Sequence, residues 1–185
     1  MQIKAVRINL SIGWVKENFG DAGFSKILNA VSEEDQRILS SKFIPVTTWV
    51  SFDTYMHLLA AIVSELGSGD ESILMRLSAD CTKKELRGVY SIFIKLGSPE
   101  FIIKRAASMF EKYFSFGEVA VTNLGHKNIM LRFCGFEKQH RLIEVATFSF
   151  CKVALELTGG KNPDVKLVKS LADGTGYFEL ACTWS

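Results

Sequence analysis

Two residues, Asp53 and His57, have the spacing with the most direct catalytic interpretation in this sequence. They are four positions apart, which places both side chains on one face of a helix. There they could form a surface ion pair or a carboxylate-oriented imidazole suited to catalysis. Because no nucleophile signature accompanies them, the surface pair is the preferred interpretation. The other two histidines, His126 and His140, fall in an expected turn and at an expected helix start, where we predict solvent exposure.

The cysteines lack the spacing of a metal knuckle or a redox dithiol. They are separated by 53, 17 and 31 residues, so no C-x-x-C pair occurs. Apolar neighbours surround them, as in Phe133-Cys134 and Phe150-Cys151. We therefore expect buried free thiols in a reducing compartment and no metal site. The thiols in question are Cys81, Cys134, Cys151 and Cys182.

The common catalytic and phosphate-binding strings are missing from the sequence. It contains no H-E-x-x-H, G-x-S-x-G, Walker-type or G-x-G-x-x-G string. Gly67-Ser68-Gly69 precedes a helix, but the acidic Asp70 and Glu71 would repel an anion there, which favours a turn between helices. Gly174-Thr175-Gly176 lies between two expected strands and predicts a hairpin. We therefore predict no catalytic residues, no cofactor and no enzymatic activity, with a dyad of Asp53 and His57 as the least favoured alternative.

Composition and charge predict an ordinary globular domain. The chain has 185 residues, 48% hydrophobic and 23% charged, which fits a single domain spanning 1–185 and excludes disorder. Lys and Arg number 22 against 20 Asp and Glu, and neither half of the chain is strongly basic. Nucleic acid is therefore disfavoured as a partner, and two small basic clusters are interpreted as solvated faces. The clusters are Lys83, Lys84 and Arg87, and Lys161, Lys166 and Lys169.

Membrane insertion and export have no sequence support. No stretch reaches 18 apolar residues without a charge, and the first residues lack the apolar run of a signal peptide. We predict a cytoplasmic protein without a membrane span.

Hydrophobic periodicity predicts helices in the first two thirds of the chain. Their starts are marked by Ser32, Ser51 and Ser98, which suit N-caps, and Gly20 suits a stop. A short extended piece is expected at 3–8 and an irregular connection at 42–50. The expected helices cover 9–19, 24–31, a segment after Ser32, 52–66, 70–96 in two pieces hinged near Thr82 or Gly88, and 99–114.

The period changes to two after Phe116. Residues 119–121 and 129–133 alternate around a plausible turn at 124–128, and two more strands flank Asp173 to Gly176. Between the hairpins, residues 140–157 predict a helix that is apolar around most of its circumference and must be covered on more than one side. The order of helices, hairpin, buried helix and hairpin predicts an α+β fold, with a helical layer packed on a small four-stranded antiparallel sheet.

Phenylalanine is unusually frequent, with fourteen in the chain. The rings could fill a core, line a cavity between the sheet and the apolar helix that receives a small apolar ligand, or form a homodimer face. A packed core is the interpretation that composition favours. The candidate ligand-binding residues of the cavity interpretation are Phe110, Phe133, Phe148 and Phe150.

Several short segments resemble a myxobacterial family of uncharacterised proteins of about 200 residues. They are Pro99-Glu100-Phe101, the segment Tyr113-Phe114-Ser115-Phe116-Gly117, the helix end Leu155 to Asn162, Asp173 to Tyr177, Trp184, and Trp49 with the helix after it. That family is distantly similar to 4-vinyl-reductase-type ligand-sensing domains, to TRAPP vesicle-tethering subunits and to haem-nitric-oxide-binding domains. The resemblance implies a helical layer on a four-stranded antiparallel sheet, often dimeric, with an apolar cavity in some members.

Two departures from these families bear on cofactors. Some of the sensing domains carry metal-binding cysteines near the C-terminal hairpin, whereas only Cys182 is present there, which argues against zinc. The haem binders use a Tyr-x-Ser-x-Arg string, whereas the segment that begins at Tyr113 ends in Gly117. No histidine lies between His57 and His126 to act as the upstream iron ligand, so haem is not expected.

Two functions follow from these observations. The first is a non-catalytic regulatory or sensory module that binds a small apolar ligand or a protein partner in an aromatic-rich pocket. The alternative is a scaffold that acts as a homodimer or complex subunit without any ligand.

Overall fold

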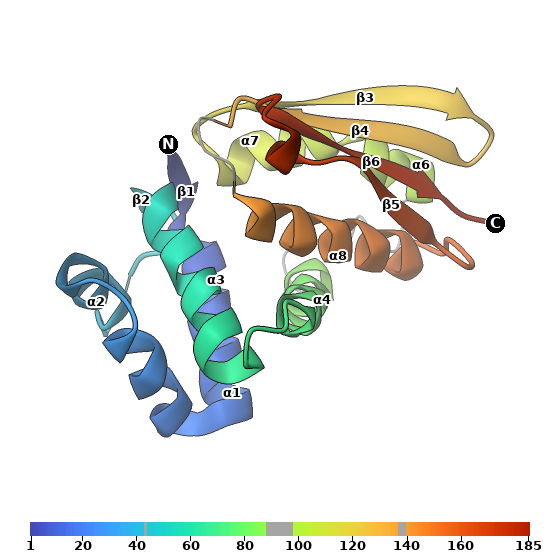
Figure 1. The fold of residues 1–185 in the computed structure, drawn as a ribbon. Coiled ribbons are helices and arrows are strands. Elements are labelled where there is room, and N and C mark those ends of the chain that lie inside the picture. Colours follow the sequence, from blue (N-terminus) through green and yellow to red (C-terminus); the bar gives the residue numbers. More distant parts are fainter. Residues whose placement is uncertain (43, 88–97, 137–139) are drawn as a thin grey trace.

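The computed structural model of the chain describes residues 1–42, 44–87, 98–136 and 140–185. Its centre is a four-stranded antiparallel sheet in the order β3-β4-β6-β5, with helices beneath one face (Figure 1). The predicted α+β fold is confirmed, as is the order of helices, hairpin, helix and hairpin. The strands are β3 (Glu118–Gly125), β4 (Asn128–Cys134), β5 (Asp164–Lys169) and β6 (Tyr177–Thr183).

Strand β6 shows why the sheet has one buried face. Its residues alternate between buried and half-buried positions, with Phe178, Leu180 and Cys182 fully enclosed. Register aligns Phe133 of β4 with Phe178 of β6, and Val119 of β3 with Phe133. The inward side chains of neighbouring strands therefore form continuous apolar rows, as the period of two predicts.

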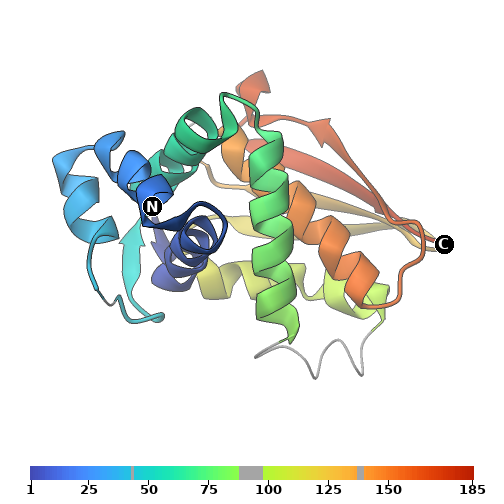
Figure 2. The same ribbon diagram turned by 90° about the horizontal axis from the view of Figure 1, so that it is seen from below.

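Helix α8 (Arg141–Leu157) lies under the sheet and is also covered by α4 (Ser72–Arg87), as Figures 1 and 2 show. Two hydroxyls of the contact between these helices donate to main-chain carbonyls of the opposite helix. Ser78 Oγ lies 2.6 Å from the carbonyl oxygen of Ala146, and Ser149 Oγ lies 2.7 Å from that of Met75. Small polar residues thus let the helices approach closely while their buried hydroxyls remain satisfied.

The N-terminal part is a separate group of helices joined to a two-stranded sheet. Strand β1 (Gln2–Lys4) pairs with β2 (Trp49–Ser51), and the elements between and after them are α1 (Ala5–Asn29), α2 (Glu33–Leu39) and α3 (Phe52–Gly67). Ser32 and Ser51 accept hydrogen bonds from Asp35 N and Asp53 N, so both predicted N-caps are confirmed. An isolated bridge from Ile3 to Phe114 ties β1 to the C-terminal part.

Helix α1 turns sharply at Gly20, as expected of a stop at this residue. Gly20 has φ 66° and ψ −172°, a backbone conformation that is essentially restricted to glycine. The break lets the last turns of α1 change direction before α2 begins (Figure 1), and a side chain of α2, Asp35, reaches His57 of α3. The two segments predicted at 9–19 and 24–31 correspond to the two parts of α1.

One helix expectation needs correction, and one of the two alternatives for another is excluded. The helix predicted over 99–114 is divided at Arg105 into α6 (Pro99–Lys104) and α7 (Ala106–Tyr113), although Ser98 caps its start as predicted. Thr82 is an interior residue of α4 with no hinge, because its side chain is fully buried in the packed helix face. The other candidate hinge, Gly88, lies outside the described residues.

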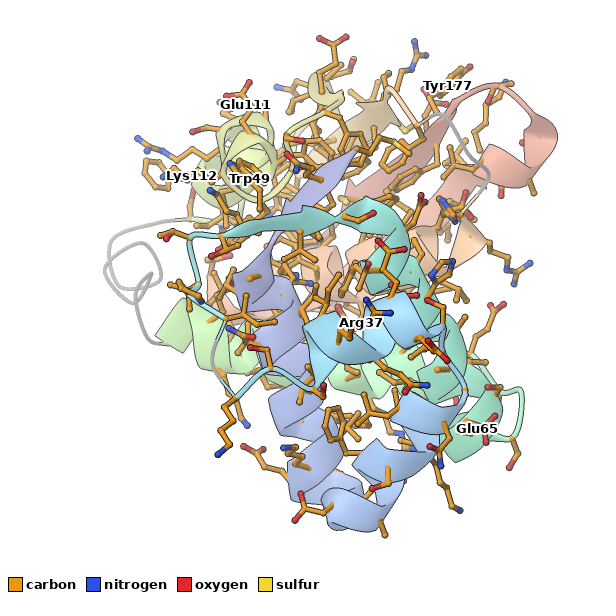
Figure 3. All side chains as sticks on the ribbon, turned by 90° about the vertical axis from the view of Figure 1, so that its left-hand side faces the viewer. Arg37, Trp49, Glu65, Glu111, Lys112 and Tyr177 are labelled. Atoms are coloured by element: carbon orange, nitrogen blue, oxygen red, sulfur yellow. The ribbon has the colours of Figure 1, made fainter. Side chains whose placement is uncertain are left out.

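The outer face of the sheet is polar. Arg132 of β4 forms an ion pair with Glu179 of β6, with 2.7 Å between Nε and Oε1. The cationic groups of Arg132 and Lys169 lie 4.8 and 5.0 Å from the ring centroid of Tyr177. Figure 3 shows Tyr177 at the periphery of the molecule. This face is therefore solvated, and the apolar side chains of the strands lie on the opposite face of the sheet.

Candidate ligand-binding site

A cavity lies where the two parts of the molecule meet, between α7, α8 and β4 on one side and α1 and α3 on the other. The centre of a water molecule can reach about 80 Å³ of it, and the atom-free space is about 630 Å³ when the open mouth is included. This is room for several waters or for one small organic molecule. The lining residues are Arg7, Tyr55, Ala106, Met109, Phe110, Tyr113, Phe114, Phe133, Ile143, Ala146, Thr147, Phe150 and Cys151.

The apolar wall of the cavity is a set of mutually packed rings. Phe110 stacks on Phe114 with 4.2 Å between ring centroids, and it meets Phe133 edge-on at 6.0 Å. Phe133 in turn stacks on Phe178 at 4.6 Å. Because each ring is held by the next, this wall is a rigid surface against which a flat apolar molecule could pack.

Three of the four aromatic residues proposed from sequence lie together at this cavity. Phe110 comes from α7, Phe133 from β4 and Phe150 from α8. Phe148 is half-buried and does not line the cavity. It lies four positions after Glu144 and therefore on the same face of α8. The carboxylate of Glu144 accepts hydrogen bonds from Ser170 and Leu171. Phe148 is therefore directed away from the other three by the helical period.

One end of the cavity is polar, because Arg7, Tyr55 and Tyr113 also line it. Arg7 Nη1 lies 3.2 Å from Oε2 of Glu85 on α4, and the two side chains are only 12% and 7% exposed. Tyr113 donates its hydroxyl proton to the other carboxylate oxygen of Glu85 at 2.5 Å. A buried ion pair with one additional donor thus closes this end of the cavity.

The electrostatic environment maintains Arg7 as a cation and Tyr55 as a neutral phenol. Burial acts to lower the pKa of Arg7, but the neighbouring Tyr55 and Glu85 raise it overall. Burial raises the pKa of Tyr55 above its ordinary value. The polar end therefore presents a guanidinium and the un-ionised hydroxyl of Tyr55.

Sequence reasoning did not select the polar end of the site. The contact between Arg7 and Glu85 joins residues 78 positions apart. No local sequence pattern predicts a pair so far apart in the chain. A weak signal was present in α1, where Arg7, Ser11 and Trp14 follow at intervals of four and three and so share one face. Ser11 and Trp14 are buried, which places Arg7 on a buried stripe.

The predicted pairing of Asp53 with His57 is wrong. His57 Nδ1 lies 2.8 Å from Oδ2 of Asp35, whereas Asp53 lies 3.7 Å from Nε2 of His140. The fold brings the buried Asp35 carboxylate of α2 to His57 of α3, and this contact overrides the four-residue spacing. Only His126 has the predicted exposed position in a turn.

His140 is more enclosed than predicted. Its side chain is 21% exposed, and its ring meets Phe52 edge-on at 5.5 Å. The start of α8 packs against the start of α3 there, which removes the solvent exposure expected of a helix start.

The cysteines are unbonded to one another, and three of the four are buried as expected. Cys134 is half-buried, because it ends β4 with its side chain on the outer side of the sheet. Cys151 lines the cavity, and a hydrogen bond with Cys182, together with burial, raises the pKa of its thiol well above the ordinary value. Within the described part of the chain, no group of three His, Cys, Asp or Glu side chains is arranged to hold a metal ion.

None of the helices within the described residues combines the length and apolar character needed to cross a bilayer.

Comparison with known proteins places the fold among H-NOX structures. An H-NOX protein from K. algicida, Fe(II) unliganded, has a TM-score of 0.77 at 10% identity and covers 99% of this chain and 97% of that one. An H-NOX protein from S. oneidensis in the Fe(II)NO ligation state has a TM-score of 0.76 at 10% identity, covering 99% of both chains. A mutant H-NOX from T. Tengcongensis has a TM-score of 0.69 at 9% identity and covers 99% and 98%.

No protein-family model matches the chain, and no curated protein does. At identities near 10% the likeness establishes a shared fold and nothing finer. Of the families that the sequence resembles, the haem-nitric-oxide-binding domains are therefore supported at the level of the fold. The resemblance to the myxobacterial family stays a prediction.

Haem is named with the H-NOX family, but the residues of this cavity do not fit it. All three histidines lie among the described residues, and none of them lines the cavity. Tyr113 donates to Glu85, and burial raises the pKa of Tyr55 and Cys151, which disfavours the anionic forms that would ligate iron. Met109 also lines the cavity, but no histidine lies there to ligate the iron with it.

Gly117, where the haem binders' string has its arginine, cannot carry a side chain here. Its φ is +70°, and a Cβ atom would lie 2.4 Å from the carbonyl oxygen of Cys134. This position therefore cannot hold a haem propionate through an arginine.

Proposed function

We propose that this chain is a non-catalytic sensory module that binds a small, mainly apolar ligand in the aromatic-lined cavity. The observation that carries the proposal is the cavity itself, with an open mouth, a rigid wall of stacked rings and a single polar end. Concave apolar sites with a few fixed polar groups are typical of small-molecule binding. The polar groups that line it are held in hydrogen bonds rather than arranged as nucleophile and base.

The energetics of such binding favour a compact ligand. A one-ring molecule that buries about 150 Å² of apolar surface gains about 4 kcal/mol at roughly 25 cal/mol per Å². Contacts with the edges and faces of Phe110, Phe114 and Phe150 would add to that figure. This is enough for weak to moderate affinity and for a ligand that exchanges readily, as a sensor requires.

Ligand occupancy could be passed on because the cavity separates two groups of elements. Arg7 and Tyr55 belong to α1 and α3, whereas Phe110 and Phe150 belong to α7 and α8. A molecule in the cavity contacts both groups of helices, so it favours a particular distance between them. The shift in population is limited by the difference in the ligand's affinity for the two arrangements of these helices.

The first test is native mass spectrometry of the purified protein beside a denatured run. A co-purifying small molecule that is lost on denaturation supports the proposal. A dimer mass with nothing bound would instead favour the alternative of a ligand-free scaffold.

The second test fills the cavity. Ala106 lines the cavity from α7, while its neighbour Ala107 is equally half-buried but does not line it. We expect Ala106→Leu to weaken binding of 4-fluoroethylbenzene at least tenfold, measured by ¹⁹F NMR titration, because the added atoms occupy the space of the ligand. Ala107→Leu, the matched control, should change the affinity less than twofold. Equal effects of the two substitutions, or no binding to the unmodified protein, would contradict the proposed function.

A further inference from the structure

The polar end of the cavity indicates which kind of apolar ligand the site would select, and this inference rests on the proposed function. Arg7, Tyr55 and Tyr113 lie at this end, and the rings of Phe110 and Phe133 line the same cavity. A purely hydrocarbon ligand would leave these polar groups against an apolar surface, which costs free energy. A ligand with a hydrogen-bonding atom at that end avoids the cost.

The donors at this end exceed the acceptors. A guanidinium has five N–H donors, and Glu85 accepts one of those of Arg7 at 3.2 Å. Tyr113 donates its hydroxyl to Glu85. The ligand atom that matches this end is therefore an acceptor.

The charge balance selects among acceptors. Arg7 and Glu85 together carry no net charge, and both are almost completely removed from solvent. A carboxylate ligand would place a second negative charge beside Glu85 in a medium of low dielectric constant, where repulsion is strong. A cationic ligand would meet Arg7, and both oxygens of Glu85 already accept hydrogen bonds. A neutral acceptor is the remaining choice.

We propose that the site binds a flat, neutral carbonyl compound, such as an aryl ketone or a quinone, with its ring against Phe110 and Phe133 and its oxygen at Arg7. The guanidinium supplies a charge-assisted hydrogen bond, which is about twice as strong as one between neutral groups. Apolar burial and this one hydrogen bond together distinguish such a ligand from hydrocarbons and from acids.

The test compares three probes of nearly equal size by ¹⁹F NMR titration: 4-fluoroacetophenone, 4-fluoroethylbenzene and 4-fluorobenzoate. We expect the ketone to bind roughly tenfold more tightly than the hydrocarbon, although water solvates the ketone better. The benzoate should bind at least tenfold more weakly than the ketone.

Two variants locate the effect. Arg7→Lys keeps the charge opposite Glu85 but lacks the planar fork, and we expect it to reduce ketone affinity severalfold with the hydrocarbon unchanged. The double variant Arg7→Met with Glu85→Gln removes both charges, and it should abolish the preference for the ketone. Urea unfolding of each variant confirms that it is folded, and Arg7→Lys preserves the test if the double variant is not.

The outcomes separate this inference from the proposed function. If the hydrocarbon binds as tightly as the ketone, or if the preference survives in Arg7→Lys and in a folded double variant, the carbonyl inference is overturned while the cavity remains a ligand site. If benzoate binds most tightly, the ligand is an acid and the charge argument is wrong. If none of the three probes binds, the proposed function fails together with the inference.

Discussion

Two Arg–Glu pairs in this molecule have the same chemistry and different surroundings. Arg7 and Glu85 are 12% and 7% exposed at the end of the cavity, whereas Arg132 and Glu179 are 50% and 14% exposed on the outer face of the sheet. The outer pair has the shorter contact, 2.7 Å against 3.2 Å. Burial rather than distance determines how much stability is lost when one partner is removed, because a buried charge without its partner is not solvated by water.

The pair of His57 and Asp35 combines an exposed cation with a buried carboxylate. Its imidazole is 58% exposed, but the carboxylate is only 6% exposed and also accepts a hydrogen bond from Ser32 Oγ at 2.8 Å. Of the three pairs, only Arg7 and Glu85 have both partners buried, because the cationic side chain is at least half exposed in the other two. The following substitutions test whether burial of both partners determines the effect on stability.

The largest effect is expected at the buried pair. Arg7→Met leaves the Glu85 carboxylate enclosed without a cation and should reduce the free energy of unfolding by about 3–5 kcal/mol, measured by urea titration. Adding Glu85→Gln should recover more than half of that loss, because no unpaired charge then remains. A single variant as stable as the unmodified chain would show that burial does not govern this pair.

An intermediate, pH-dependent effect is expected at Asp35. Burial acts to raise the pKa of its carboxyl, but hydrogen bonds from Thr54, Ser32 and His57 hold the pKa below its ordinary value. A lowered pKa in the folded state stabilises the fold above the unfolded pKa of about 4, and this stabilisation is lost as the pH falls through the folded pKa.

Asp35→Asn removes the group that titrates. We expect a loss of about 1–2 kcal/mol near pH 7 and a flatter dependence of stability on pH below about pH 4. Urea titrations at several pH values measure both quantities. An unchanged acid profile in this variant would show that Asp35 is not the group responsible.

The smallest effect is expected at the outer pair. Arg132→Met should change the urea midpoint less than Asp35→Asn does, because solvent already screens this contact. The remaining difference should disappear at about 1 M salt, where the screening length is about 3 Å. A loss equal to that of Arg7→Met would show that burial of both partners does not explain the difference between the two Arg–Glu pairs.

The sequence predicted those parts of the fold that rest on local pattern. The alternation of Phe178, Leu180 and Cys182 gave β6 its buried face, and Ser32, Ser51 and Ser98 marked helix starts because a capping hydroxyl acts within three residues. The four-stranded sheet with a helix between its hairpins followed from the change of period after Phe116.

The candidate site was only partly predictable, for a physical reason. The structure places Phe110, Phe133 and Phe150 at the cavity but not Phe148. The sequence does not distinguish these four residues, because all large apolar rings favour enclosure whether or not they line a cavity. The pairing of Arg7 with Glu85 is a long-range contact made when α1 packs against α4. In the same way, the fold brings Asp35 of α2 to His57 of α3, which local spacing had assigned to Asp53.

Gly20, which divides α1, also determines where the helix that follows it lies. No atom would collide with a Cβ placed on Gly20, so a substitution there meets open space and only the dihedral angles oppose it. An alanine at this position would favour a continuous helix and would direct the following turns, together with α2, away from α3. The contact between Asp35 and His57 would then be lost although neither residue is altered. Replacing one hydrogen atom by a methyl group would thus separate the end of α1 and α2 from the rest of the protein.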